Sequence, residues 1–403
     1  TTGTQNVAIG NFSLFDNTTA INNTGIGYNT LASTTTGTQN TAVGSVALDN
    51  NLTGASNTAV GYNALGANTT ASNNVAIGVG AMSTNTTGHS SVAIGKDALQ
   101  LHTTGDNNTA VGFEAGHSCT TGSGNVMVGD LAGYAITTAE RCVFIGNTSG
   151  YAAGAITGDK NTAIGDNAMR SVSSGNQCTA LGSTALMDLT TGHNNTAIGF
   201  EAQQNLTTGA GNASCGHNSL NSATTGGSNS ALGNTALGEV TTGSNNFAIG
   251  NDAGRVNSAA NITTHSNHGV LGNNSMTFIG AQVSLTVSSD QRDKTDITDF
   301  TKGLEIINAL RPVTYKWDQR SDYSSDLSVT PDGTYKKPKI NLGLLAQEVH
   351  TVEKANGYGN NENEYLFINL SDDGQKYGLQ YERFVPVLIN AVKELSAKNT
   401  ALE

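Results

Sequence analysis

Residues 40–61 read NTAVGSVALDNNLTGASNTAVG, so the string N-T-A-V-G ends at Gly44 and again 17 residues later at Gly61. Related strings continue this spacing through a first run of coils, at Gly10, Gly27, Gly44, Gly61, Gly78, Gly95, Gly112, Gly129 and Gly146. After a step of 19 residues a second run follows, and a step of 22 then leads to the last member, at Gly165, Gly182, Gly199, Gly216, Gly233, Gly250 and Gly272. Sixteen coils at a fixed period identify a repeat protein.

Each position of the repeat keeps its own chemistry. The residue before the Gly is Ile, Val or Leu, apart from Cys215. The third residue after the Gly is small, and the fourth is mostly Leu or Met, as at Leu31 and Leu65. Asn stands four residues before the Gly in 12 of the 16 coils, as at Asn57, and many coils end in T-T-G, as at Gly88.

A period of 17 residues fits neither a pair of helices nor a coiled coil, because both need long runs of helix formers. It predicts a mainly β chain, in which a parallel β-solenoid (β-roll or β-helix) has two short strands and two turns per coil. We expect the Ile and Val before the Gly to point inward. T-T-G and G-x-N should supply the positive φ angles of the corners, and stacked Asn side chains should hydrogen-bond between coils. Sixteen coils would make a rod of roughly 75 Å.

Such a coil has little to bury. We expect each coil to bury one Ile, one Ala and one Leu, which is a thin core for a free-standing solenoid. The columns of small Ala and Ser residues would let backbones approach closely. These features predict that copies pack together as a homotrimer. The N-x-A-I-G coils resemble the heads of trimeric autotransporter adhesins, which have shorter coils in a left-handed parallel β-roll, and similar strings occur in viral fibres.

The composition changes sharply near Ser288. Residues 1–288 hold only 5 of the 19 Lys and Arg and 13 of the 31 Asp and Glu, and all four prolines and the single Trp317 come later. We therefore predict a shaft over residues 1–280, a junction over 281–288 and a second, small α+β domain over 289–403. Because the chain begins with Thr1 and ends within a helical pattern, we expect it to be a segment of a longer protein.

The second domain shows helical and strand patterns in turn. The segment 303–312, G-L-E-I-I-N-A-L-R-P, predicts a helix that ends before the proline, with an apolar face of Leu304, Ile307 and Leu310. Residues 313–317 predict a strand, and residues 341–349 predict a strand leading into a helix. A C-terminal helix from about residue 380 should begin a coiled-coil seam formed by Leu388, Ala391, Leu395, Lys398 and Leu402.

Together with the string S-D-Q-R-D-K at residues 289–294, these motifs resemble the C-terminal intramolecular chaperone domain of endosialidase-type phage tail spikes. The resemblance implies a trimeric chaperone that templates the preceding fibre and then cuts itself off between Ser288 and Ser289. It implies a Ser289–Lys294 dyad, supported by Asp290 and Arg292. A serine hydroxyl needs a base to take its proton, and a lysine serves only when desolvation favours its neutral form.

Composition excludes several other functions. The net charge of −12 argues against nucleic-acid binding, and no apolar run of about 18 residues suggests membrane insertion. We expect no cofactor and no metal, because no calcium nonapeptide and no clustered Cys or His ligands occur.

The four cysteines lie in different coils, so we expect free thiols. Aromatic residues directly after the Gly could stack on sugars, but they are scattered among coils, at Tyr28, Tyr62, Phe113 and Phe200.

The function that these patterns favour is a trimeric phage tail fibre or spike, extracellular on the virion. Its expected partners are two further copies, other tail proteins and a host glycan or protein receptor. The insertions at residues 147–164 and 251–271 are the candidate contact regions. At most the chain is a single-turnover self-cleaving serine endopeptidase. The alternatives are a polysaccharide depolymerase spike, although the acids of the shaft are sparse, and a cellular trimeric adhesin.

Overall fold

A computed structural model describes residues 2–255, 258, 261–276, 278–280, 282, 289–324, 327–370, 374 and 376–402. The chain divides into two compact units. The first contains Thr1–Arg255 and Ile262–Gly272, and the second contains Val256–Asn261 and Asn273–Glu403. Of the predicted junction at 281–288, all residues except Gln282 lie outside the described part of the chain.

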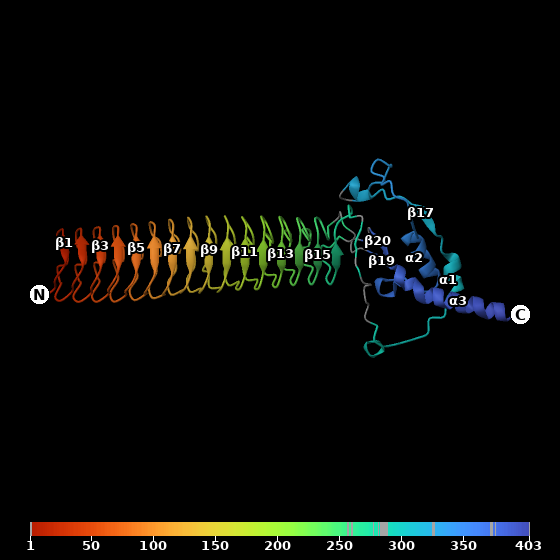
Figure 1. Cartoon of the computed structure of the whole chain (residues 1–403), viewed down its shortest axis with the longest axis horizontal. Helices are drawn as coiled ribbons and strands as arrows, with labels where there is room; N and C mark the ends of the chain where they lie inside the picture. The colour runs from red at the N-terminus through yellow and green to blue at the C-terminus, as the bar shows by residue number, and fades with distance from the viewer. Residues whose placement is uncertain are drawn as a thin grey trace. The chain divides into compact units, whose positions relative to one another are not determined.

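The first unit is a shaft built on one parallel sheet, in which sixteen three-residue strands stack in chain order (Figure 1). Each strand pairs with the equivalent residues of the next coil, so that Val60 lies opposite Ile77. This confirms the predicted parallel β-solenoid of 17-residue coils. The strands are β1 (Val7–Ile9), β2 (Thr24–Ile26), β3 (Thr41–Val43), β4 (Thr58–Val60), β5 (Val75–Ile77), β6 (Val92–Ile94), β7 (Thr109–Val111), β8 (Val126–Val128), β9 (Val143–Ile145), β10 (Thr162–Ile164), β11 (Thr179–Leu181), β12 (Thr196–Ile198), β13 (Ala213–Cys215), β14 (Ser230–Leu232), β15 (Phe247–Ile249) and β16 (Gly269–Leu271).

Each coil has one strand, so the prediction of two was wrong. After the Gly, left-handed residues alternate with others, as at Asn63 (φ 57°) and Leu65 (φ 52°), and an extended strand cannot form there. Coil-to-coil hydrogen bonds continue nevertheless, for example from Leu65 N to Ala81 O at 3.0 Å. The far side of the coil is therefore a ladder of turns.

The two predicted glycine positions behave differently. Gly78, which ends a strand, has φ +141°, and a Cβ there would lie 2.3 Å from the carbonyl oxygen of Gly95, so the G-x-N prediction of positive φ is confirmed. The T-T-G prediction was wrong, because Gly88 does not have a positive φ. Gly88 is needed for space instead, since a Cβ there would lie 2.4 Å from Gly105 O.

The core of the shaft is lined by the middle residue of each strand, not by its ends. Ala76, the middle residue of β5, is fully buried, whereas Ile77, at the end of β5, is 39% exposed. Ala81 and Met82, which follow the strand, are fully buried as well. Side chains alternate across a strand, so the small middle residue points inward and both neighbours point outward. The prediction that Ile and Val face inward was therefore wrong. The small column three residues after the Gly also belongs to the coil's own interior, so it is no surface for packing between copies.

The Asn column forms the predicted ladder within this core. Asn57 Oδ1 accepts a hydrogen bond from Asn74 N at 3.0 Å, and Asn57 Nδ2 donates to Ala71 O at 2.9 Å. The contact is repeated in neighbouring coils, since Asn40 Oδ1 accepts from Asn57 N. Each side chain thus satisfies buried backbone groups of the next coil, which would otherwise be costly to bury.

The second unit is a small α+β domain. Its buried core contains Ile306, Val349, Phe367, Ile368, Phe384 and Val387. Among the described residues no helix combines the length and the hydrophobicity needed to cross a bilayer. The elements are η1 (Gln291–Asp293), α1 (Leu304–Ala309), β17 (Val313–Tyr315), η2 (Arg320–Asp322), β18 (Asn341–Gly343), α2 (Ala346–Ala355), η3 (Glu362–Glu364), β19 (Ile368–Leu370), β20 (Tyr377–Leu379), η4 (Tyr381–Arg383) and α3 (Phe384–Thr400), with β17 antiparallel to β18 and β19 antiparallel to β20.

Two predicted helix faces need correction. The fully buried residue of α1 is Ile306, while the predicted Ile307 and Leu310 are only partly buried. In α3 the predicted seam is split: Ala391 packs inside its own domain, whereas Leu388 is 48% exposed. The face of α3 that remains open is formed by Val385, Leu388, Ile389, Val392 and Leu395, and Leu402, just beyond the end of the helix, continues it.

Candidate functional site

The predicted dyad residues lie in hydrogen-bonding contact. Lys294 Nζ is 2.6 Å from Ser289 Oγ and 3.3 Å from the carbonyl oxygen of Ser289. This geometry suits proton transfer from the hydroxyl to a neutral amine. Ser288, whose carbonyl would be attacked, lies outside the described residues.

A single 3₁₀ turn, η1, brings the two side chains together. Asp290 caps it, because its Oδ1 accepts from Arg292 N at 2.9 Å. Arg292 also pairs with Asp290 through its guanidinium, at 2.5 Å between Nη2 and Oδ2. These bonds lower the pKa of Asp290 and raise that of Arg292. The sequence-predicted supporting residues thus fix the turn between Ser289 and Lys294 and do not contact the hydroxyl.

The dyad is exposed to solvent in the single chain. Ser289 and Lys294 are both exposed, and so are Asp293 and Asp296 on either side of the lysine. Within the described residues neither carboxylate forms an ion pair with Lys294. A lysine becomes a base when burial disfavours its charge. One chain alone does not supply that burial.

The rest of the domain is held by a close crossing of α1 and α3. A Cβ on Gly303 would lie 2.4 Å from Ala391 N, so only glycine fits at this crossing. One turn further along α3, Glu394 Oε2 accepts from Leu304 N at 3.1 Å and caps the first turn of α1. Nothing in the periodicity of α3 identified Glu394 as a cap, because its partner is 90 residues away in sequence.

The cysteine, histidine and acidic side chains form no metal-binding cluster in the part of the chain that the structure describes. That part contains no group of three or more His, Cys, Asp or Glu side chains that could hold a metal ion. The four cysteines are free, which confirms the prediction of free thiols. Burial raises the pKa of Cys119 to about 12 and that of Cys142 to about 11, so both thiols are unreactive at neutral pH.

A second cluster, which we call the aromatic ladder, was missed at the sequence level. It consists of Gln100, His117, Tyr134 and Tyr151, each the fifth residue after the Gly of four consecutive coils. The His117 and Tyr134 rings stack 4.9 Å apart, and the Tyr134 and Tyr151 rings stack 5.4 Å apart. His117 Nε2 lies 2.7 Å from Gln100 Oε1, and Gln100 Nε2 donates to Asp97 Oδ1. The signal for it was the strings A-G-H, A-G-Y and S-G-Y at a spacing of 17.

By contrast, the aromatic residues directly after the Gly form no such row. Phe200 stacks on His217, 5.4 Å away, and Lys96 lies over the ring of Phe113, 5.3 Å from its centroid. Tyr28 makes an edge contact with Phe12. His217 also directly follows a Gly, so Phe200 and His217 form a stack of two rings that extends no further along this column. These short contacts agree with the interpretation that the residues pack locally.

Comparison with known families assigns the C-terminal region. The family model described as the chaperone of endosialidase matches residues 289–358, beginning at the dyad serine. Searches of curated proteins and of solved structures give no match. The chain therefore carries an endosialidase-type intramolecular chaperone domain at the end of a β-solenoid shaft, an organisation that fits a tail fibre or tail spike.

Proposed function

We propose that the protein is a homotrimeric phage fibre that attaches the virion to its host, and that its C-terminal domain assembles the shaft and then cuts itself off. The observation that carries the proposal is an apolar face that runs along the whole shaft. The residue before each Gly points outward, and its exposed fraction is 58% at Ile9, 38% at Ile94 and 48% at Ile249. None of the sixteen strands contains a charged residue.

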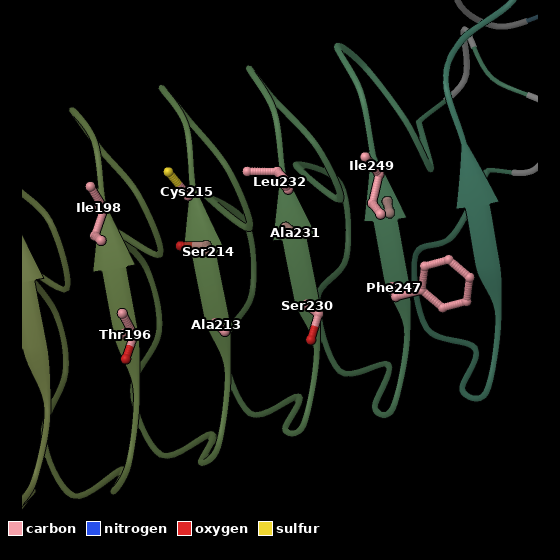
Figure 2. Close-up of a pocket in the computed structure, with 11 residues that line it drawn as sticks. Thr196, Ile198, Ala213, Ser214, Cys215, Ser230, Ala231, Leu232, Phe247 and Ile249 are labelled. Carbon is pink, nitrogen blue, oxygen red and sulfur yellow. The ribbon is translucent and has the colours of Figure 1, made fainter.

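Contiguous exposed apolar surface of this length is typical of an interface. A partner that covers it must repeat at the same spacing as the coils, and another copy of the chain does so. Figure 2 shows four successive members of the column, Ile198, Cys215, Leu232 and Ile249, beside a hollow of about 300 Å³. The hollow arises because β13 carries Ala213 and Cys215 where the preceding strand carries Thr and Ile.

The open face of α3 supports the same assembly. Val385, Leu388, Val392, Leu395 and Leu402 follow one another at steps of three, four, three and seven residues and are 48–86% exposed. This spacing is that of a coiled-coil seam. The position missing from the series is Asn399, and a single polar residue in a seam sets the register of the helices.

Assembly would also complete the dyad. In the proposed reaction Ser289 Oγ attacks the carbonyl carbon of Ser288 while neutral Lys294 takes the hydroxyl proton. The lysine passes this proton to the Ser289 nitrogen, the C–N bond breaks, and an ester joins Ser288 to Ser289 Oγ. Water then hydrolyses the ester to a carboxylate and a hydroxyl. Neighbouring chains would supply the burial that Lys294 lacks alone, so cleavage would follow correct assembly.

Intact mass analysis beside a denaturing gel tests this step. We expect the wild-type protein to give a fragment that begins at Ser289, and we expect Ser289→Ala and Lys294→Met to give only the full chain. Ser324→Ala, outside the dyad, is the matched control and should cleave normally. A wild-type chain that assembles fully and stays intact would refute the self-cleavage part of the proposal.

For attachment, the insertions at residues 147–164 and 251–271 are the candidate contact regions. In the first, Ala153, Gly154 and Ala155 are exposed, while Ile156 keeps its parallel bridge to Ile136 in the coil before. The loop therefore protrudes without breaking the ladder of coils. Binding of fluorescent fibres to host cells should fall when residues 153–155 are deleted. Unchanged binding would show that residues 153–155 are not the part of the fibre that contacts the host.

A further inference from the structure

The coils that carry the aromatic ladder are built differently from the rest of the shaft. In the coils of His117, Tyr134 and Tyr151 the fourth residue after the Gly is Gly116, Gly133 and Gly150, where most other coils place Leu or Met in the core. The space is filled from the strand side by Met127 and Phe144, which replace the usual Ala. A Cβ on Gly133 would lie 2.6 Å from Met127 Cγ, and one on Gly150 would lie 2.6 Å from Phe144.

This exchange shows that the ladder is not a by-product of the repeat. Three consecutive coils carry glycine at the fourth position, two of them also replace the Ala of the strand, and the same three coils place a ring at the fifth position. The core of Leu and Ala in the other coils would be sufficient if the only role of these coils were to keep the shaft stiff. The altered core is fully packed, because Met127 and Phe144 are completely buried.

The ladder leaves its two tyrosine hydroxyls available for a ligand. His117, Tyr134 and Tyr151 are each half-buried, so their rings are held in place while part of each remains in solvent. Neither tyrosine hydroxyl forms a hydrogen bond with any residue that the structure describes. Tyrosine in this setting offers contact area and a hydrogen-bonding group at little entropic cost.

We propose that the aromatic ladder binds an uncharged polysaccharide that lies along the shaft axis. Four coils at a spacing of about 4.8 Å present a track about 14 Å long. One step of the track is close to the length of one sugar ring in an extended chain, so successive sugars would meet successive rungs. The phenol groups of Tyr134 and Tyr151, which bond to no residue that the structure describes, suit a ligand rich in hydroxyl groups.

Charge favours a neutral ligand. The chain carries a net charge of −12, and acidic residues lie in these same coils at Asp97, Glu114 and Asp130. A polyanionic ligand would be repelled from this surface. The proposal rests on the attachment function proposed above, and it names the class of ligand and the site that would bind it.

Electrophoresis of the full chain through native gels that contain dextran, mannan, galactan or sulfated dextran tests the proposal. We expect at least one neutral polysaccharide to retard the wild-type protein and sulfated dextran not to. Tyr134→Ala/Tyr151→Ala should weaken the apparent affinity by about tenfold or more. Tyr62→Ala, an exposed tyrosine outside the ladder, is the matched control and should leave the retardation unchanged.

A second variant separates binding from folding. Tyr134→Phe/Tyr151→Phe keeps the stack and removes only the two hydroxyls, and it should also weaken retardation at an unchanged melting temperature. No retardation by any neutral polysaccharide, or equal retardation of the alanine variant, would overturn the proposal. If the ladder variants still bound host cells, the ladder would not be the binding site. Attachment, for instance to a protein receptor, would still stand. If the wild-type fibre did not bind host cells at all, attachment itself would be refuted.

Discussion

At the scale of single residues, the glycine that ends each strand is the least replaceable part of the shaft. Gly78 combines a left-handed backbone with a carbonyl oxygen 2.3 Å from where a Cβ would lie. That oxygen belongs to Gly95 of the next coil, whose own N donates to Ile77 O at 2.8 Å, so it has little freedom to move. The repeat therefore demands glycine for two independent reasons, conformation and space.

Gly78→Ala should accordingly destabilise the shaft by about 2 kcal/mol or more, from the strained φ and the forced shift of the neighbouring coil. Gly154→Ala is the matched control. No atom outside its immediate chain neighbours lies within 4 Å of a Cβ at that position, and its φ is not left-handed. Urea unfolding followed by circular dichroism compares the two. Equal midpoints would show that the coils are not packed as closely as described.

The buried thiols make a prediction about pH. Their pKa values, about 12 for Cys119 and about 11 for Cys142, lie above the ordinary 9.0 because burial disfavours the thiolate. As pH rises past 9, the unfolded chain loses these protons first, so the free energy of unfolding falls between pH 9 and about 12. Cys119→Ala/Cys142→Ala should flatten this fall in urea titrations over pH 7–10.5, whereas Cys215→Ala, an exposed cysteine, should not. A double variant with the wild-type slope would contradict the buried environment.

At the scale of elements, the crossing of α1 and α3 determines whether the chaperone domain closes. Gly303→Ala should destabilise that domain by about 1–3 kcal/mol, because its Cβ would meet the backbone at Ala391. Gly378→Ala serves as control, since its closest contact would be an ordinary 3.6 Å. Hydrogen exchange of α1 amides, measured by mass spectrometry, would report the difference. Equal protection in both variants would mean that this crossing does not limit stability.

The elements themselves were largely predictable from sequence, but the faces that they bury were not. The columns located every strand of the shaft. However, a three-residue strand has no periodicity long enough to say which side faces inward, so the larger residue, such as Ile77, was taken as the core. In α3, spacings of three and four allow two overlapping seams. Packing against α1 buries Ala391 and leaves Leu388 outside, and that contact joins segments about 90 residues apart.

In the Ser289–Lys294 site, too, local features were predictable from the sequence and non-local features were not. The spacing of Ser289 and Lys294 and the cap at Asp290 are local, and one turn brings them together. Lys294 is exposed in the single chain, and its proposed burial would depend on neighbouring copies, which no local pattern encodes. The aromatic ladder was not predicted because most coils carry no ring at the fifth position, where Tyr134 and Tyr151 lie, so the repeat shows no aromatic column there.

At the scale of the whole molecule, the residues that the structure describes leave two apolar surfaces uncovered, the outward column of the shaft and the open face of α3. Leu395→Asp places a charge in the α3 seam and should reduce the yield of assembled, cleaved fibre several-fold. Ala397→Asp adds the same charge on an exposed position away from the seam and should have little effect. Comparing the fraction cleaved on a denaturing gel distinguishes them, and equal cleavage would show that α3 does not pair with other copies.

The central claim is that three chains bury the outward column of the shaft between them. Light scattering coupled to size-exclusion chromatography, performed on the Ser289→Ala variant so that every chain keeps its C-terminal domain, measures this directly. We expect a particle with the mass of three chains that persists on dilution. A stable, folded species with the mass of one chain would contradict it.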